Sequence, residues 1–496
     1  MALRVFDSLT RKKVDFEPLS PGKVTMYLCG PTVQDAPHIG HARSALAFDV
    51  IRRFLRWSGW QVTYARNVTD IDDKIIKKAA ERGWSADEHA RHFTAIYRRE
   101  MAAVGNQDPD IEPKVTETIP EIVAFIEKLV ANGKAYESKG DVYFSVESFA
   151  PYGALSGQSI DELRAGARIE VDEDKRNPLD FALWKAQKPG EPAWDSPWGK
   201  GRPGWHIECS AMIHTVLGET IDIHGGGRDL VFPHHENELA QSQGALGPNT
   251  FVRHWLHNGL LNLGEKMSKS LGNVLLVEDM RRHYVGETLR YYLVQFHYRA
   301  AINFDLVRAD DGSVSFPGID AADRRLDYLY TTLQRLDDFL GGKTDVDAGP
   351  TLPDGEGLPA RAREAMDDDF NTAVVVAELG EAAKAANKLL DDPKAAPKDV
   401  RRRTLARLRR DLGDVGPGIL GILGRPPGEF LAERRTLLCT ARKIDAAAVA
   451  QRLADRDAAR KGKDYARADE IRSELRTLGV DIMDTPRGTE WRVIEA

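Results

Sequence analysis

The stretch KVTMYLCGPTVQDAPHIGHARSALAFDV, residues 23–50, predicts a buried strand that leads through a glycine- and proline-containing turn into a helix. We expect the strand to end at Cys29 and the helix to span about residues 42–57. The next strand is QVTYARNV, residues 61–68. Strand, helix and strand in this order favour a parallel sheet joined by a right-handed crossover.

The composition is that of a globular protein without membrane segments. Hydrophobic residues make up 42% of the 496 residues, and no apolar run approaches the ~20 residues of a membrane helix. The N-terminal segment lacks the apolar core of a signal peptide, which predicts a cytoplasmic protein. Three cysteines are too few for a disulfide framework, so those that matter are expected to be metal ligands or nucleophiles. The net charge of −7 argues against broad electrostatic binding of nucleic acid but allows a local basic surface.

The rest of the chain divides into segments of different character. A proline-, glycine- and charge-rich insertion interrupts the α/β pattern, which resumes at ETIDIHGGG, residues 219–227. Leucines spaced three and four residues apart from Leu326 to Leu340 predict a helix of a later bundle. We therefore expect an α/β fold with a parallel sheet split by an insertion, followed by an α-helical bundle and a small α+β C-terminal domain. The expected boundaries are 1–113 and 204–262 for the two halves of the sheet domain, 114–203 for the insertion, 263–314 for a connecting region, 315–425 for the bundle and 432–496 for the last domain.

The string PHIGH, residues 37–41, lies between the first strand and its helix. A helix N-terminus binds anions through its free amide groups and the positive end of its dipole. Gly40 would let a flat ring or a phosphate approach the backbone closely. His38 and His41 could stabilise charge that develops on a phosphate. Taken alone, the string is equally consistent with ordinary cap and core residues.

A second string, KMSKS at residues 266–270, lies between Gly264 and Gly272. Two lysines with small hydroxyl residues and flanking glycines predict a cationic loop that could hold a departing pyrophosphate. Taken alone, this string is as well explained by an ordinary surface loop. PHIGH and KMSKS on the two halves of one interrupted sheet, however, resemble the paired signature of the class I aminoacyl-tRNA synthetases.

Two cysteines, one histidine and one glutamate form a candidate metal set. Cys29 ends the first strand, and Cys209 lies in GWHIECSAM, residues 204–212, just after the insertion. His234 and Glu238 are four residues apart, so both would project from one face of a helix. Two thiolates, an imidazole and a carboxylate are suitable zinc ligands, although the long separation of the cysteines leaves an ordinary structural role open.

Three longer stretches resemble the cysteinyl-tRNA synthetase family. They are IHGGGRDLVFPHHENELAQS at 223–242, the GWHIECSAM segment, and DYARADEIRSELRTLGVDIMDTPRGTEW at 464–491, and the similarity extends over nearly the whole chain. The resemblance implies a Rossmann-type catalytic domain that activates L-cysteine with ATP and Mg²⁺ and transfers it to the 3′-terminal ribose of tRNA(Cys). It also implies one Zn²⁺ ion that binds the substrate thiol. Its ligands would be Cys29, Cys209, His234 and Glu238.

The resemblance also implies residues for the nucleotide and amino-acid pockets. The ATP-binding residues would be Pro37, His38, Gly40, His41, Asp229, Lys266, Met267, Ser268, Lys269 and Ser270, of which His38, His41, Lys266 and Lys269 would be catalytic. The cysteine-binding residues would be Trp205, His206, His224 and Thr69. For Asp229 and for the cysteine-binding residues, packing or support of a neighbouring side chain remains an open alternative.

The C-terminal half predicts contacts with tRNA by a monomeric enzyme. The bundle and residues 432–496 would hold the anticodon end, with a basic helix face at 401–410 and Trp491 as a stacking candidate. Cys439 matches no motif and is expected to be a structural thiol. Two other functions are alternatives. One is a ligase that joins cysteine to an amino-sugar, as in mycothiol synthesis, and that would share these motifs. The other is a non-catalytic tRNA-binding paralogue. The C-terminal domain disfavours the first, and the intact motifs disfavour the second.

Overall fold

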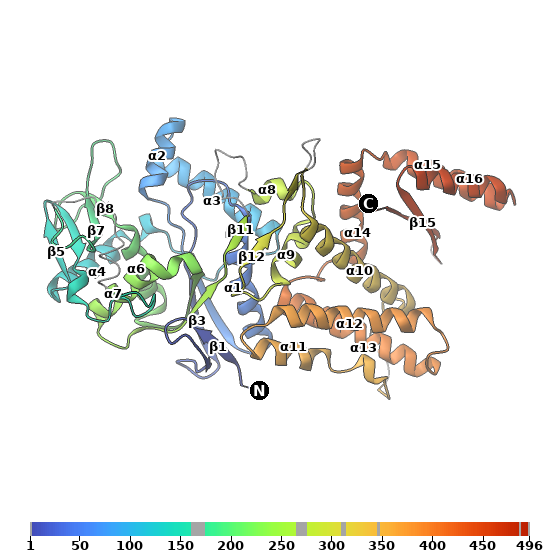
Figure 1. The fold of residues 1–496 in the computed structure, drawn as a ribbon, viewed down its shortest axis with the longest axis horizontal. Coiled ribbons are helices and arrows are strands. Elements are labelled where there is room, and N and C mark those ends of the chain that lie inside the picture. The colour runs from blue at the N-terminus through green and yellow to red at the C-terminus, as the bar shows by residue number, and fades with distance from the viewer. Residues whose placement is uncertain are drawn as a thin grey trace.

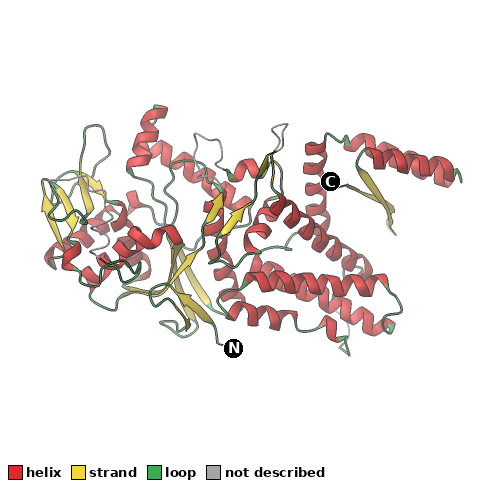
Figure 2. Ribbon diagram, in the orientation of Figure 1, coloured by secondary structure: helices red, strands yellow, loops and turns green. Residues whose placement is uncertain are grey.

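The computed structural model describes residues 2–159, 174–263, 275–308, 314–344, 348–485 and 488–494. An α/β domain lies between a strand-rich insertion on one side and a helical bundle on the other, and the C-terminal elements lie beyond the bundle (Figure 1). Colouring by secondary structure shows strands in the insertion and in the central sheet, long helices in the bundle, and a further pair of strands at the C-terminal end (Figure 2). None of the described helices combines the length and the apolar content needed to cross a bilayer.

The central sheet has four parallel strands in the order β10-β9-β3-β4. Their bounds are β3 Lys23–Leu28, β4 Gln61–Arg66, β9 Thr220–Gly227 and β10 Phe251–Asn258. β3 pairs with β4 on one side and with β9 on the other, so the two halves of the interrupted domain meet inside one sheet. The helix α1 (Ile39–Trp57) makes the crossover from β3 to β4, as the sequence predicts.

A close approach between α1 and β9 explains part of the glycine run in β9. A Cβ atom built on Gly225 would lie 2.2 Å from the ring of Phe48, which is buried in α1. Only a residue without a side chain therefore lets α1 lie this close to the sheet at that point. An antiparallel hairpin formed by β1 (Arg4–Asp7) and β2 (Lys12–Asp15) packs against β10.

The insertion builds a second, antiparallel sheet with the strand order β5-β6-β7-β8. Its hydrophobic core, which includes Phe125, Phe144 and Trp184, is separate from that of the central sheet. The chain returns from β8 directly into the helix that carries Cys209. The bounds are α2 Asp73–Arg82, α3 Ala86–Ala103, α4 Ile119–Ala131, β5 Ala135–Ser138, β6 Asp141–Phe144, β7 Phe181–Ala186, β8 Gly201–Pro203, α6 Trp205–Leu217 and α7 Glu236–Leu246.

The connecting region joins the sheet domain to the bundle. β11 (Leu261–Leu263) pairs in parallel with β12 (Ile302–Phe304). Between them lie α8 (Val277–Met280) and α9 (Gly286–Val294), and β13 (Val307–Arg308) pairs with β14 (Val314–Ser315).

A bundle of long helices follows. Leucines on one face of its first helix are buried, as their spacing predicts; they are Leu326, Leu329, Leu333, Leu336 and Leu340. The bundle helices are α10 Pro317–Leu340, α11 Leu358–Asp367, α12 Thr372–Asp391 and α13 Lys398–Val415. The C-terminal elements are α14 Pro427–Arg442, α15 Ala446–Lys461, α16 Tyr465–Thr477 and the antiparallel pair β15 Val480–Thr485 and β16 Gly488–Val493. The expected fold class is confirmed.

Candidate functional site

Four donor side chains from distant parts of the chain meet beyond the carboxyl end of β3. They come from the end of β3, from α6, from the turn before α7 and from the first turn of α7; they are Cys29, Cys209, His234 and Glu238. Cys29 Sγ lies 3.5 Å from Cys209 Sγ and 3.4 Å from Glu238 Oε1. His234 Nε2 lies 2.9 Å from the same carboxylate oxygen. One ligand atom from each residue lies within 4.8 Å of all the others.

The parallel sheet brings the first of these residues to the others. The backbone N–H of Cys29 donates to the carbonyl of Gly225 at 3.2 Å, which ties the end of β3 to β9. Ligand sites of open α/β sheets form beyond the carboxyl ends of such strands. The chain that leaves β9 then turns into α7 and supplies His234 and Glu238.

The cluster is buried and its members change one another's protonation. Burial alone would raise the pKa of Glu238, but the neighbouring His224 and His234 outweigh it and hold that pKa well below its usual value. Burial lowers the pKa of His234, but the Glu238 carboxylate raises it to about 10. The hydrogen bond from Cys29 lowers the pKa of the Cys209 thiol to about 6, against the effect of burial. The cluster therefore holds an ionised carboxylate beside a readily ionised thiol.

This donor set fits a zinc ion. Two sulfurs, one imidazole nitrogen and one carboxylate oxygen are ligands that zinc accepts, and structural or substrate-binding zinc sites use such mixtures. The ionised Glu238 carboxylate and the Cys209 thiol of lowered pKa are ready to bind a metal, whereas Cys29, whose pKa burial raises, and His234 would release their protons when the ion binds. The described residues thus satisfy the zinc prediction in chemistry and in proximity.

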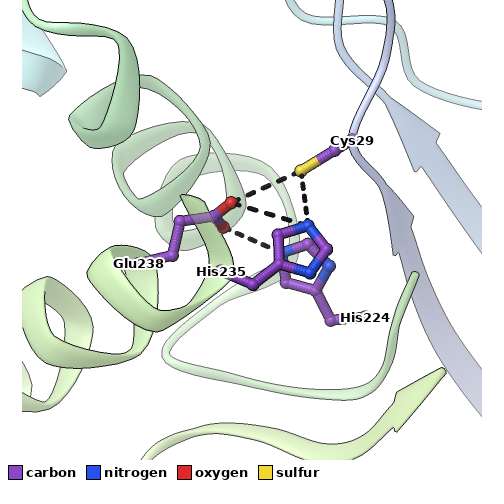
Figure 3. A group of neighbouring side chains, drawn as sticks. All are labelled: Cys29, His224, His235 and Glu238. Atoms are coloured by element: carbon purple, nitrogen blue, oxygen red, sulfur yellow. Dashed lines mark hydrogen bonds and ion pairs between the residues drawn. The ribbon is translucent and has the colours of Figure 1, made fainter. Parts of the chain in front are cut away.

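A second group of the same kind shares two of these residues. Cys29, His224, His235 and Glu238 also place their ligand atoms within 4.8 Å of one another (Figure 3). His224 Nε2 lies 2.8 Å from Glu238 Oε2, and His235 Nε2 lies 3.3 Å from Cys29 Sγ. The two histidines thus contact two of the predicted zinc ligands.

The predicted cysteine-binding residues surround the cluster. The Trp205 ring stacks on the His234 ring with centroids 4.1 Å apart, and it is 37% exposed. His206 Nδ1 lies 3.0 Å from His234 Nδ1. Burial and the neighbouring His234 lower the pKa of His206 to about 3, so this ring is neutral. Trp205 and His206 therefore cover the cluster on the side of α6.

Thr69 reaches the cluster through other buried polar groups. Its hydroxyl donates to Glu208 Oε2 at 2.9 Å, and Asn67 Nδ2 donates to the Thr69 hydroxyl at 3.3 Å. Burial raises the pKa of Glu208 well above its usual value, and the neighbouring Cys209 raises it further. Thr69 thus belongs to a buried polar wall beside Cys209.

The PHIGH turn caps α1 with its own histidines. The backbone N–H of Gly40 donates to His38 Nδ1 at 3.1 Å, and the backbone N–H of His38 donates to His41 Nδ1 at 3.2 Å. Because each Nδ1 accepts a hydrogen bond, each neutral ring carries its proton on Nε2. Burial lowers the pKa of His41 to about 3, helped by His38, and burial also lowers the pKa of His38. Both rings are therefore neutral Nε2–H donors at pH 7.

The other predicted nucleotide residues lie around this turn. Burial lowers the pKa of His38, and the negative charge of Asp229, in the turn that follows β9, partly opposes this. A Cβ atom at Gly40 would lie 2.9 Å from His38 Nδ1, so glycine at this position protects the cap. Pro37 accepts a hydrogen bond at its carbonyl from the backbone N–H of Val277 at 3.0 Å.

The KMSKS string lies outside the described residues, so Lys266, Met267, Ser268, Lys269 and Ser270 are not placed. The segment just after it is described and is bonded to PHIGH. The backbone N–H of Ile39 donates to the carbonyl of Leu275 at 2.9 Å, and His38 and Leu276 form a β-bridge. The chain that leaves KMSKS is therefore attached to the N-terminus of α1.

Comparison with known proteins decides the family. A family model described as the tRNA synthetases class I (C) catalytic domain matches residues 15–310, a DALR domain matches 361–423, and a cysteinyl-tRNA ligase anticodon binding domain matches 431–492. A cysteine–tRNA ligase of Geobacter sulfurreducens is 47% identical over 500 residues, which cover 99% of this chain and 100% of that protein. One of Anaeromyxobacter dehalogenans is 48% identical over 501 residues with the same coverage. This chain belongs to the cysteinyl-tRNA synthetase family.

Solved structures of other synthetases share the fold. The methionyl-tRNA synthetase of Mycobacterium tuberculosis in complex with methionyl-adenylate has a TM-score of 0.60 at 16% identity, and the match covers 82% of this chain and 93% of that one. A ternary LeuRS–tRNA–LeuAMS complex of Agrobacterium radiobacter has a TM-score of 0.57 at 13% identity, with 85% and 86% covered. The expected family, fold class and enzyme class, a cysteine–tRNA ligase, are confirmed.

Three buried residues beside the cluster are absent from the sequence predictions. His235 contacts Cys29, the neighbouring His257 contacts His235, and Tyr27 lies against both cysteines. The double histidine of PHHENE is a signal for His235, because it stands three residues before Glu238 and can share its helix face. His257 and Tyr27 lie in strands, where the sequence offers no comparable signal.

Proposed function

We propose that this member of the cysteinyl-tRNA synthetase family activates L-cysteine with ATP and loads it onto tRNA(Cys), with a zinc ion that selects the substrate thiol. The observation that carries the proposal is the cluster of Cys29, Cys209, His234 and Glu238 within 4.8 Å. The amino-acid carboxylate attacks the α-phosphate of ATP and pyrophosphate leaves. A hydroxyl of the terminal ribose of tRNA then attacks the adenylate, and AMP leaves.

The four residues of the cluster would hold the zinc ion. A bound zinc ion supplies a soft Lewis acid that prefers a thiolate to the neutral hydroxyl of serine. Apolar contacts alone separate substrates that differ by one small group by only about 1–3 kcal/mol. Trp205 and His206 exclude water beside His234 and line the pocket for the amino acid, with His224 and Thr69 behind them.

Two neutral imidazoles would act on the phosphates. The caps of α1 leave the Nε2–H groups of His38 and His41 as donors, and donors fixed before the reaction stabilise charge without reorganisation. Pro37 and Gly40 shape this turn, and Asp229 would accept a hydrogen bond from a ribose hydroxyl. Mg²⁺ would enter with ATP. The KMSKS residues Lys266, Met267, Ser268, Lys269 and Ser270 would close over the phosphates, with both lysines on the departing pyrophosphate.

The C-terminal half would bind tRNA. We assign residues 315–425 to the anticodon stem and 432–496 to the anticodon, and this is supported by the family match at 431–492. The basic stretch 401–410 contributes less to the binding of tRNA phosphates than its charge suggests. Arg409 pairs with Asp337 of α10 at 2.6 Å, whereas Arg410 is exposed. Phosphate contact from this stretch is therefore assigned to Arg410.

Trp491 is half-buried, and it is a weaker stacking candidate than its chemistry suggests. The Arg435 guanidinium lies 4.8 Å from the centre of its ring, so one face of the ring is already covered. We further propose that the enzyme acts as a monomer in the cytoplasm.

The test is cysteine-dependent exchange of pyrophosphate into ATP, measured on zinc-loaded and on chelator-stripped protein, with serine as the control substrate. We expect exchange with cysteine alone, its loss on stripping and its return with added zinc. Loading of tRNA(Cys) with radioactive cysteine follows on the same samples. Exchange that accepts serine, or that is unchanged by stripping, would remove the proposed role of the cluster.

A further inference from the structure

A line of hydrogen-bonded side chains runs from the surface of the molecule to Cys29. His235 Nε2 lies 3.3 Å from Cys29 Sγ, and His235 Nδ1 lies 2.8 Å from His257 Nε2. His257 Nδ1 in turn lies 2.7 Å from the hydroxyl of Ser8. His235 is fully buried, His257 is nearly so, and Ser8 is half-buried. We call Ser8, His257 and His235 the histidine line.

The chemistry of the ends fixes the direction of every bond in the line. A cysteine that ligates zinc is a thiolate and can only accept hydrogen bonds. His235 must then donate from Nε2 to Cys29 and accept at Nδ1. His257 must donate from Nε2 and accept at Nδ1, and the hydroxyl of Ser8 supplies that proton. All three bonds are satisfied in this one arrangement, and both rings stay neutral.

The far end of the line is held by backbone bonds. The backbone N–H of Ser8 donates to the carbonyl of Trp255 at 2.9 Å, and the backbone N–H of Trp255 donates to Asp7 Oδ1 at 2.9 Å. These bonds fasten the β1–β2 hairpin to β10, the strand that carries His257. The N-terminal hairpin, which is distant from the metal cluster in sequence, thereby fixes the orientation of the imidazole next to Cys29.

A second histidine, His224, holds the carboxylate of the proposed ligand Glu238 in a similar way. His224 Nε2 lies 2.8 Å from Glu238 Oε2, while His234 and Cys29 lie near the other oxygen, Oε1. His224 thus contacts one of the proposed ligands, Glu238, and His235 contacts another, Cys29, as Figure 3 shows. Partners of this kind set the orientation and basicity of metal ligands, and their loss costs about 10–100-fold in metal affinity.

We propose that the histidine line positions the Cys29 thiolate for zinc, so that Ser8, His257 and His235 are positioning residues and not ligands. The inference rests on the proposed function, because it takes Cys29, Cys209, His234 and Glu238 as the zinc ligands. It gives the N-terminal hairpin a role in the metal site. Loss of a bond in this line weakens zinc binding although no ligand has changed.

The decisive variants change His257, whose side-chain hydrogen bonds go to His235 and Ser8 and to none of the four proposed zinc ligands. His257→Phe keeps the ring volume and removes both hydrogen bonds, whereas His257→Gln keeps a donor near the position of Nε2. His254→Phe is the matched control, because His254 lies on the same strand, is equally buried at 6% exposed, and packs on Phe16 away from the cluster. Zinc affinity is measured on the full-length protein by competition with a chelator at constant pH.

We expect His257→Phe to weaken zinc binding about 10–100-fold, with His257→Gln close to wild type and His254→Phe unchanged. Ser8→Ala should give a smaller loss in the same direction. Equal affinity in His257→Phe and wild type, or an equal loss in His257→Phe and His254→Phe, would overturn the inference.

X-ray absorption at the zinc edge of the wild-type protein distinguishes two results: that the inference about the histidine line is wrong, and that the proposed function is wrong. Two sulfur ligands support the proposed set. One sulfur with two imidazoles would instead make His224 and His235 ligands, which would overturn both the ligand set and the inference. Two sulfurs together with an unchanged His257→Phe affinity would overturn the inference alone.

Discussion

The N-terminal turn of α1 and the metal cluster both use histidine side chains, yet they are built in opposite ways. In the turn, His38 and His41 are three residues apart and take their hydrogen bonds from the same short segment. In the cluster, Cys29, Cys209 and His234 come from three segments that only the sheet brings together. A substitution that disrupts the packing of these three segments can therefore destroy the cluster and leave the geometry of the turn intact.

The turn and the cluster also differ in the charge of their side chains. The turn holds neutral rings, because burial lowers the pKa of His41 to about 3 and nothing nearby opposes it strongly. In the cluster, burial alone would raise the pKa of Glu238, but His224 and His234 hold it well below its usual value, so the carboxylate is ionised. Neutral donors suit a phosphate that gains charge in the transition state, and an ionised carboxylate suits a cation. Variants that affect one site and spare the other test this division.

The largest effect is expected from Cys209→Ala. Removal of one of two thiolates should abolish stoichiometric zinc and lower cysteine-dependent exchange by about 1,000-fold or more, beyond the ~10–100-fold cost of losing an outer partner. Metal analysis and pyrophosphate exchange provide the measurements. Cys439→Ala is the control, since this buried thiol lies in α14 away from the cluster. Full zinc content in Cys209→Ala would refute the ligand set.

His38→Asn should act on the turn and spare the cluster. The asparagine side chain can still cap α1 but has no Nε2–H donor, so helix stability is retained. We expect kcat for exchange to fall about 100–1,000-fold, the usual cost of losing one such donor. Zinc content and the KM for cysteine should not change. A fall in zinc content would mean that the two sites are coupled more closely than their separate construction implies.

Asp49→Asn tests the buried ion pair that anchors α1, the helix that begins with the PHIGH turn, to α9. Asp49 Oδ2 accepts from the partly buried Arg53 at 2.7 Å and from the fully buried Arg290 of α9 at 2.6 Å. Breaking such a buried pair costs about 3–5 kcal/mol of unfolding free energy. Urea unfolding at pH 7 measures it. Asp15→Asn is the control, because Asp15 is exposed and its pair with Arg4 should contribute little.

The effect of Asp49→Asn should also depend on pH. Burial alone would raise the pKa of Asp49, but Arg290 and Arg53 lower it from 3.8 to about 2. The stabilisation is therefore complete above about pH 5 and is lost as the pH falls through about 2. The difference between variant and wild type should shrink over that interval. A difference that stays constant down to pH 2 would contradict the assignment.

The smallest effect is expected from Trp205→Leu. Loss of the stack on His234, with centroids 4.1 Å apart, should cost about 0.5–1.5 kcal/mol. The KM for cysteine should rise about 2–10-fold, while the KM for ATP stays the same. Trp198→Leu serves as control, because Trp198 packs on Trp184 inside the insertion. Equal changes in both KM values would place Trp205 outside the amino-acid pocket.

Several features of the site were predictable from the sequence, and others were not. The four-residue spacing of His234 and Glu238 predicts that they are neighbours on one helical face, and they do meet, with His234 in the helical turn just before α7 and Glu238 in the first turn of α7. His235 could have been inferred from the same spacing. Ser8 and His257 could not, because their contact depends on how the β1–β2 hairpin packs on β10. The role of the basic stretch 401–410 was open for a related reason: charge in a sequence does not reveal that Arg409 pairs with Asp337 of a neighbouring helix.

The sequence by itself determined the elements, the two short signature strings, the family and the four candidate ligands, because local periodicity and residue chemistry are carried by adjacent positions. Only the tertiary structure decided which atoms meet. It brought Cys29 within 3.5 Å of Cys209, and it linked Ser8 to Cys29 through two imidazoles. Hydrogen bonds act over about 3 Å, and the separations that matter here are set by strand order and helix packing, which no single segment encodes.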